Sequence, residues 1–249
     1  FSDPADLNGL AHFCEHLLFM GTAKYPKENE YNEFLSAHGG HSNAYTSSDD
    51  TNYYFEVGPE HLEKALDIFA QFFIEPLFSE SCKDREVRAV DSENKKNLQN
   101  DLWRLHQLDR SLSNPKHPIS KFSTGNLETL EENPNSQNIN VRDRLIQFYK
   151  EHYSANLMKV VVIGRESLDQ LQEWVTEKFS AVPNTNKSKP FYDASPYAPE
   201  NINVLIKAKP VKDIKRLSLR FPIPDLLDYY EIKPAQYLSH CIGHEGPGS

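Results

Sequence analysis

The residues best suited to chemistry lie near the start of the chain, in the run HFCEH at positions 12–16. His12 and His16 are four residues apart, so in a helix both imidazoles lie on one face with Glu15 beside them. Zinc accepts two imidazoles and one carboxylate while keeping a position open for water. Zinc activates such a water for hydrolysis, and a carboxylate can accept its proton. The run therefore predicts a metal-dependent hydrolytic site.

The same pattern has a simpler explanation, because it arises by chance in about 3% of chains with this composition. A third ligand further along the chain strengthens the metal interpretation. Glu86 and Glu93 are candidates, since they are seven residues apart and lie on nearly one face of a predicted helix. Each alone is more often a solvated surface carboxylate. From the residues alone, both explanations stay open.

The helix that carries HFCEH has a second role in the core. Its apolar residues recur at helical spacing on a stripe roughly opposite His12, Glu15 and His16; they are Leu10, Phe13, Cys14, Leu17 and Leu18. We expect Gly21 to end the helix and the stripe to pack inward. The core thus fixes the face that presents the imidazoles.

The remaining elements follow from periodicity and turn residues. We expect a hairpin of strands at 41–47 and 51–57 and a long helix at 81–108 that turns Val87, Val90, Leu98, Leu102 and Leu105 inward. Further helices are expected at 30–37, 59–75, 141–153, 166–182 and 233–243, strands at 156–164, 202–210 and 216–224, and a loop at 114–135. Because strands and helices do not alternate regularly, the fold class is α+β, with a mixed sheet packed against helices.

A linker is predicted at 183–201, which is rich in proline and polar residues and has no periodicity. This stretch places a domain boundary near residue 190. We expect a metal-bearing domain over 1–189 and the beginning of a second domain over 190–249. We also expect the chain to be part of a longer polypeptide.

Composition narrows the classes of partner. The net charge of −9 over 249 residues argues against binding to nucleic acid or to an anionic membrane surface. Three widely spaced cysteines form no disulfide framework, which favours the cytoplasm, with mitochondria and peroxisomes as alternatives. No apolar run reaches the length of a membrane span. Peptides and small molecules remain as partners.

Four runs, GLAHFCEHLLFMGTAKYPKENEYNEFLSAHGG, SNAYTSSDDTNYYFEV, LFSESCKDREVRAVDSENKKNLQND and GHEGPGS, closely resemble the insulysin branch of the pitrilysin-type inverted zinc-motif metallopeptidases. The likeness runs through nearly the whole chain and is weakest in the linker. It implies the pitrilysin and processing-peptidase fold, with a second similar domain after the first. It also implies one zinc ion per chain, held by His12, His16 and Glu93.

The resemblance further assigns roles to single residues. It implies that Glu15 is the base rather than a ligand and that Glu86 supports the site. It places substrate on Asn43 and Ala44 of an edge strand, and the substrate's N-terminus on His240, Gly243 and Glu245. The partners implied are peptide substrates and the C-terminal half of the same polypeptide, which closes a chamber; a homodimer of the full-length protein is allowed.

The function predicted is that of a zinc metalloendopeptidase that degrades short, flexible polypeptides, with little or no activity in the isolated 249 residues. A non-catalytic peptide-binding or assembly subunit of the same fold is the alternative, and the complete set of His12, Glu15, His16 and Glu93 favours the enzyme. A purely structural zinc domain would need a closed shell of four ligands, and only three are visible.

Overall fold

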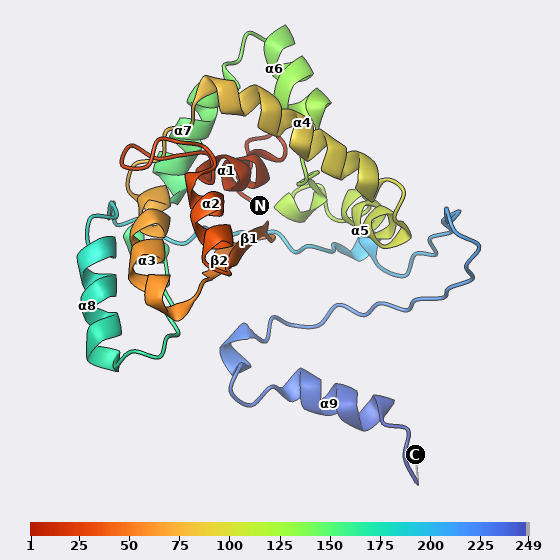
Figure 1. The fold of residues 1–249 in the computed structure, drawn as a ribbon. Helices are drawn as coiled ribbons and strands as arrows, with labels where there is room; N and C mark the ends of the chain where they lie inside the picture. The colour runs from red at the N-terminus through yellow and green to blue at the C-terminus, as the bar shows by residue number, and fades with distance from the viewer. Residues whose placement is uncertain (248–249) are drawn as a thin grey trace. The chain divides into compact units, whose positions relative to one another are not determined.

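The fold is known from a computed structural model that describes residues 1–247 (Figure 1). The chain forms two compact units, Phe1–Lys212 and Asp213–Ser249. Helices and strands run in the order α1 (Leu10–Leu18), α2 (Glu30–Ala37), β1 (His41–Thr46), β2 (Thr51–Glu56), α3 (Leu62–Ala70), α4 (Glu80–Asn97), α5 (Asp101–Ser111), α6 (Asn133–Ser136), α7 (Val141–His152), α8 (Leu168–Phe179) and α9 (Pro234–Gly243). The α+β class is confirmed.

Helix α1 is the centre of the first unit, where it packs against α4, α7 and β1 (Figure 1). The apolar stripe expected from the sequence is confirmed, since all five of its residues have no exposed surface: Leu10, Phe13, Cys14, Leu17 and Leu18. The carboxylate of Asp3 accepts the backbone N–H groups of Gly9 and Ala11, both at 2.8 Å. This carboxylate satisfies donors that the first helical turn leaves free and places negative charge at the helix N-terminus.

Strands β1 and β2 form the predicted hairpin and pair antiparallel, with Ala44 opposite Tyr53 and Thr46 opposite Thr51. Ser47 and Asp50 close the turn through a backbone hydrogen bond of 2.8 Å. Exposure alternates along β1, so that Ala44 and Thr46 lie on the more buried face. One face of the hairpin therefore covers α1, as the period of two along a strand requires.

The sheet is smaller than the sequence predicted. Among the described residues it consists of β1 and β2 only and is antiparallel rather than mixed. The runs expected to be strands at 156–164, 202–210 and 216–224 lie outside any sheet; the first begins in a 3-10 turn, Ala155–Leu157, and the remainder has no regular structure. Val161 is 83% exposed and Ile163 is 90% exposed. A strand needs a neighbour that supplies the ladder of hydrogen bonds, and apolar composition alone does not provide one.

The helix predicted at 81–108 is two helices, α4 and α5, separated at 98–100. Asn100 has an extended backbone, and its side-chain oxygen accepts the N–H of Leu102 at 2.9 Å, which starts a new helix. Val87 and Val90 are buried as expected, whereas Leu98 and Leu102 are exposed. The stretch 114–135, expected to be a loop, contains a π-helical turn at Glu128–Glu132 and the start of α6.

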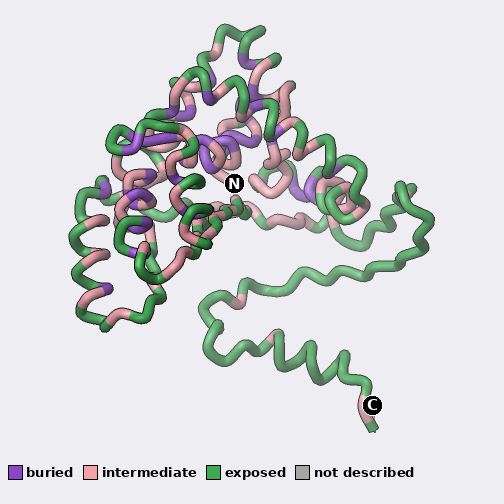
Figure 2. Tube along the Cα trace, viewed as in Figure 1, coloured by how far each residue is buried: buried purple, intermediate pink, exposed green. Residues whose placement is uncertain are grey.

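Burial separates the two units, as the colours in Figure 2 show. Among the described residues, every buried side chain lies in the first unit and none lies in the second. Within the second unit α9 is the one α-helix of the described residues. No helix in the described range 1–247 has the length and apolar content that crossing a membrane requires. The domain boundary near residue 190 stays a prediction.

Candidate metal centre and active site

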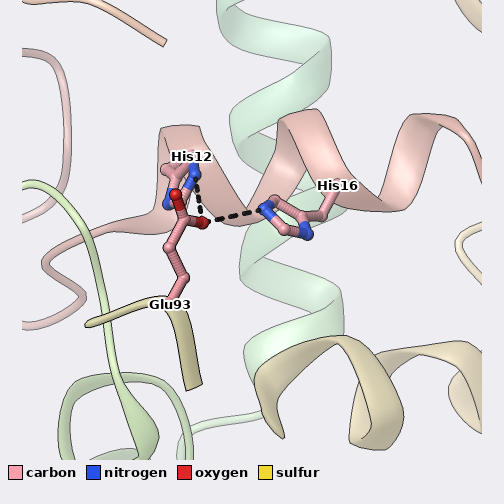
Figure 3. Close-up of side chains that lie close together, drawn as sticks. All are labelled: His12, His16 and Glu93. Carbon is pink, nitrogen blue, oxygen red and sulfur yellow. Dashed lines mark ion pairs between the residues drawn. The ribbon is translucent and has the colours of Figure 1, made fainter. Parts of the chain in front are cut away.

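The two imidazoles of α1 meet a carboxylate from α4. Glu93 Oε2 lies 3.6 Å from His12 Nε2 and 3.8 Å from His16 Nε2. Figure 3 shows both rings turned toward this one oxygen from successive turns of α1. One ligand atom from each residue lies within 4.8 Å of the others, and this is the one group of its kind among the described residues. His16 and Glu93, which have 76 residues between them in the sequence, are thus brought together.

The outer nitrogen of each ring is held by a specific acceptor. His12 Nδ1 donates to the carbonyl of Thr124 at 2.7 Å, and His16 Nδ1 donates to Glu86 Oε2 at 3.1 Å. In the neutral form that binds a metal, these bonds keep the ring proton on Nδ1, so that the Nε2 lone pair is the one directed toward Glu93. Glu86 was expected to support the site, whereas Thr124 was missed by sequence reasoning. No signal in residue type could reveal it, because it acts through its backbone.

Two glycines allow the loop that carries Thr124 to reach the start of α1. A Cβ atom on Gly9 would lie 2.2 Å from the Cα of Gly125, far inside van der Waals contact. Both glycines have positive φ, at +90° and +79°, which residues with a Cβ rarely adopt. The close approach brings the Thr124 carbonyl within hydrogen-bond distance of His12 Nδ1.

The charges around the site favour a cation. Burial lowers the pKa of His16, but the interactions with Glu86 and Glu93 outweigh it and raise this pKa to about 9. The interaction with His16 lowers the pKa of Glu93 despite its partial burial. The imidazole of His16 thus holds a proton in the absence of metal, and a metal ion competes with that proton for the same negative surroundings.

Comparison with known proteins places the chain in a family. Residues 1–116 match the model of the insulinase family, peptidase family M16, and residues 140–249 match the peptidase M16 inactive domain. The chain belongs to peptidase family M16. It is 59% identical to the human insulin-degrading enzyme over 248 residues and 55% identical to the A-factor-processing enzyme of Saccharomyces cerevisiae over 249, in each case across 100% of the chain. It spans about a quarter of each relative, 24%.

The fold of this M16 chain is also that of a solved relative. The crystal structure of pitrilysin matches it with a TM-score of 0.77 and 37% sequence identity, over 80% of this chain and 21% of that chain. The family and fold implied by the sequence resemblance are thus confirmed.

Glu15 is the residue of HFCEH whose surroundings differ most from expectation. The helical projection placed it on the polar side of α1, but β1 covers it and leaves it 6% exposed. Its Oε2 accepts a hydrogen bond of 2.5 Å from the hydroxyl of Thr46 on β1. Glu15 stands outside the group of three residues whose ligand atoms lie within 4.8 Å of one another. Thr46 was not among the residues expected at the site.

The predicted substrate residues lie in two places. Asn43 and Ala44 belong to β1 and are exposed and half-buried, respectively. The Asn43 side chain accepts the N–H of Ala44 at 2.9 Å. His240 and Gly243 belong to α9, Glu245 follows it, and all three are exposed in the second unit. The rings of His240 and His244 lie 5.1 Å apart.

Proposed function

We propose that this M16 chain carries the metal-binding and proton-transfer residues of a zinc metalloendopeptidase that acts on short, flexible polypeptides. The observation that carries the proposal is the convergence of His12 Nε2, His16 Nε2 and Glu93 Oε2 on one gap. Family membership supports it, because one M16 relative of known sequence is an insulin-degrading enzyme. Since the chain spans about a quarter of that relative, the activity belongs to the proposal.

The donor set fits zinc. Ligand atoms 2.0–2.2 Å from a tetrahedral zinc ion are about 3.4 Å apart, and the two imidazole nitrogens lie 3.6 and 3.8 Å from the Glu93 oxygen. These separations exceed the usual length of a hydrogen bond. Two neutral imidazoles and one carboxylate leave room for a water ligand. His12, His16 and Glu93 would hold the ion, while Thr124 and Glu86 orient the rings.

A zinc ion bound there would lower the pKa of its water from about 15.7 toward 7 and polarise the carbonyl of the peptide bond. Glu15 accepts a proton from the attacking water and gives it to the nitrogen of the leaving amine. Burial suits Glu15 to this role, because a carboxylate with few water neighbours keeps its position between the two transfers.

The edge of β1 suits an extended peptide. Among the described residues β1 pairs with β2 alone, so its other edge offers backbone groups to an added strand. Backbone pairing does not depend on side chains. We therefore expect loose sequence preference combined with a strict requirement for a flexible substrate. The Asn43 side chain already occupies the N–H of Ala44, and a substrate strand that uses this donor has to displace it.

Substitution of Ala44 by proline tests this pairing. Ala44→Pro removes the N–H of the edge, and we expect KM for a flexible peptide to rise or kcat to fall while zinc content stays at the wild-type level. The measurement is peptide kinetics and metal analysis on one preparation of the full-length protein that carries the substitution. Unchanged kinetics in a folded variant would show that substrate does not pair with β1.

Two other functions fit the site less well. A structural zinc domain needs four protein ligands, and the described residues supply a group of three. A non-catalytic peptide-binding subunit needs no base, yet Glu15 is held beside the site by a dedicated hydrogen bond. We infer that a C-terminal half of the same polypeptide completes the chamber, that the isolated chain has little activity, and that the protein is cytoplasmic.

Metal content tests the proposal most simply. We expect one zinc ion per chain in the purified protein, measured by atomic emission, and a severe loss of zinc affinity in His12→Ala, His16→Ala and Glu93→Ala. His61→Ala is the matched control, because the ring of His61 lies against that of His38, with centroids 3.7 Å apart and a tilt of 45°, and His61 is not part of the ligand group. Zinc at background level in the wild-type protein would contradict the proposal.

A further inference from the structure

Thr46 joins the strand proposed to carry substrate to the residue proposed as base. It is the last residue of β1 and lies on the same face as Ala44, two positions along the strand. Its Oγ1 donates to Glu15 Oε2 at 2.5 Å. A hydroxyl bonded to a carboxylate makes a short, charge-assisted hydrogen bond, which is stronger than a bond between neutral groups. Thr46 thus fixes one oxygen of a buried side chain.

The other oxygen of Glu15 has different surroundings. Within the described range 1–247, Glu15 Oε1 accepts no hydrogen bond from the protein. It is not fully enclosed either, because the buried side-chain oxygens in that range that lack a partner are Asn8 Oδ1, the Tyr31 hydroxyl and Glu166 Oε2. A glutamate has three rotatable bonds, and holding Oε2 restricts the rotations that would move Oε1. The unbonded oxygen is therefore presented in one orientation.

Thr46 is itself supported from the opposite strand. Thr51 faces it in the register of the hairpin, and the two hydroxyl oxygens lie 3.4 Å apart. Because the Thr46 proton is engaged with Glu15, the Thr51 hydroxyl is the donor in this pair. The hydroxyl of Thr46 is thereby held from both sides, and the order of donors runs from Thr51 through Thr46 to Glu15.

We propose that Thr46 is the positioning residue of the general base: its hydroxyl holds Glu15 Oε2 so that Oε1 receives the proton of the attacking water. This inference rests on the proposed hydrolytic function and deepens it. In the step, one O–H bond of water breaks, its proton binds Oε1, and the electron pair left on the water oxygen forms a bond to the peptide carbon while the π pair of the C=O bond moves to the carbonyl oxygen. That pair then re-forms C=O as the peptide C–N bond breaks, and the leaving nitrogen takes the proton from Oε1. The Thr46 proton stays on Oγ1 throughout.

The hydrogen bond also ties base placement to the strand that binds substrate. Thr46 and Ala44 belong to one rigid, hydrogen-bonded hairpin, so a peptide paired with β1 and the carboxylate of Glu15 share one frame. Misplacement of a reacting group by about 1 Å can lower a rate on the order of a hundredfold. We expect substitution of the Thr46 side chain to influence kcat far more than KM, because it removes the hydroxyl bound to Glu15 and leaves the backbone groups of β1 in place.

The test uses Thr46→Val and Thr46→Ser in the full-length protein. Valine keeps the shape and removes the hydroxyl, and we expect kcat for a flexible peptide to fall about ten- to hundredfold with KM and zinc content near wild type. Serine keeps the donor and restores most of kcat. Thr51→Val is the matched control, because it alters the same hairpin but leaves the Thr46 to Glu15 bond, and its loss is smaller.

A crystal structure of metal-free Thr46→Val gives a readout independent of activity. We expect Glu15 in a different rotamer, or in several, with α1 and β1 unmoved. Wild-type kcat in a folded Thr46→Val variant, an unmoved Glu15, or an equal loss in Thr51→Val would overturn the assignment. An inactive, zinc-free wild-type protein would instead contradict the proposed function, so the two failures are distinct.

Discussion

The two units of the chain bury their side chains to very different extents. In the first unit α1 is enclosed, and Phe13 has no exposed surface. In the second unit α9 is an amphipathic helix whose apolar residues face solvent, with Tyr237 72% exposed and Ile242 78% exposed. The metal centre is therefore held by a core of its own unit, whereas His240 and Gly243 on α9, and Glu245 just after it, are exposed. Precise placement of functional groups depends on such a core.

The two units should differ most in how far a single substitution lowers the free energy of unfolding. Phe13→Ala should lower the free energy of unfolding by about 3–5 kcal/mol, because it removes a buried ring and leaves a cavity. Leu238→Ala on α9, where the side chain is 60% exposed, should change it by less than about 0.5 kcal/mol. Urea unfolding followed by far-ultraviolet circular dichroism measures both. Equal effects would mean that the second unit has a core that these contacts do not reveal.

A smaller effect is expected at Gly9, which does not bind the metal but allows the loop of Thr124 to orient the metal ligand His12. Gly9→Ala would push the loop of Thr124 and Gly125 away from α1 and free His12 Nδ1, so zinc affinity should fall about ten- to hundredfold. The control is Gly39→Ala. Gly39 also has positive φ, at +71°, but a Cβ there meets nothing within 4 Å.

Chelator competition gives the zinc affinity of both glycine variants. Both glycines have positive φ, so an alanine strains the backbone at either position. The difference in zinc affinity between the two variants therefore reports the clash with Gly125. Equal zinc affinity in Gly9→Ala and Gly39→Ala would show that the loop does not orient His12.

The smallest effect is expected from alkylation of the cysteine thiols. Burial raises the pKa of the Cys14 thiol to about 12, and at pH 8 only about one thiol in 10⁴ is then ionised. Cys82 is buried as well, whereas Cys241 on α9 is exposed. Iodoacetamide should therefore label Cys241 first and leave Cys14 intact in the folded chain, as peptide mass mapping would detect. Labelling of Cys14 at the rate of Cys241 would contradict the enclosed position of α1.

Much of the first unit was accessible from sequence because its signals are local. The spacing of apolar residues located α1, and the alternating run followed by SDD located the hairpin. The break at Asn100 was missed because the polar face of α4 continues into α5 without a change in composition. The run around Val161 has the apolar content of a buried strand, but composition cannot supply a pairing partner, and Val161 is exposed.

The site shows the same limit. The i, i+4 spacing indicated His12 and His16, whereas Glu93 was one of two open candidates until family resemblance singled it out. The bond from Thr46 to Glu15 depends on how the hairpin packs on α1, and the bond from His12 to Thr124 uses a backbone carbonyl. Neither has a signature in residue spacing, because both arise only when distant segments meet.

The substitution Glu15→Gln tests the central claim most directly, when zinc content and peptide hydrolysis are measured on the same preparation of the full-length protein. Glutamine keeps the size of the side chain and can still accept from Thr46, but it cannot take a proton from water. We predict one zinc ion per chain, as in the wild-type protein, and a loss of kcat of about 10²–10⁴-fold. A zinc-loaded Glu15→Gln variant that hydrolyses the peptide at the wild-type rate would contradict the account.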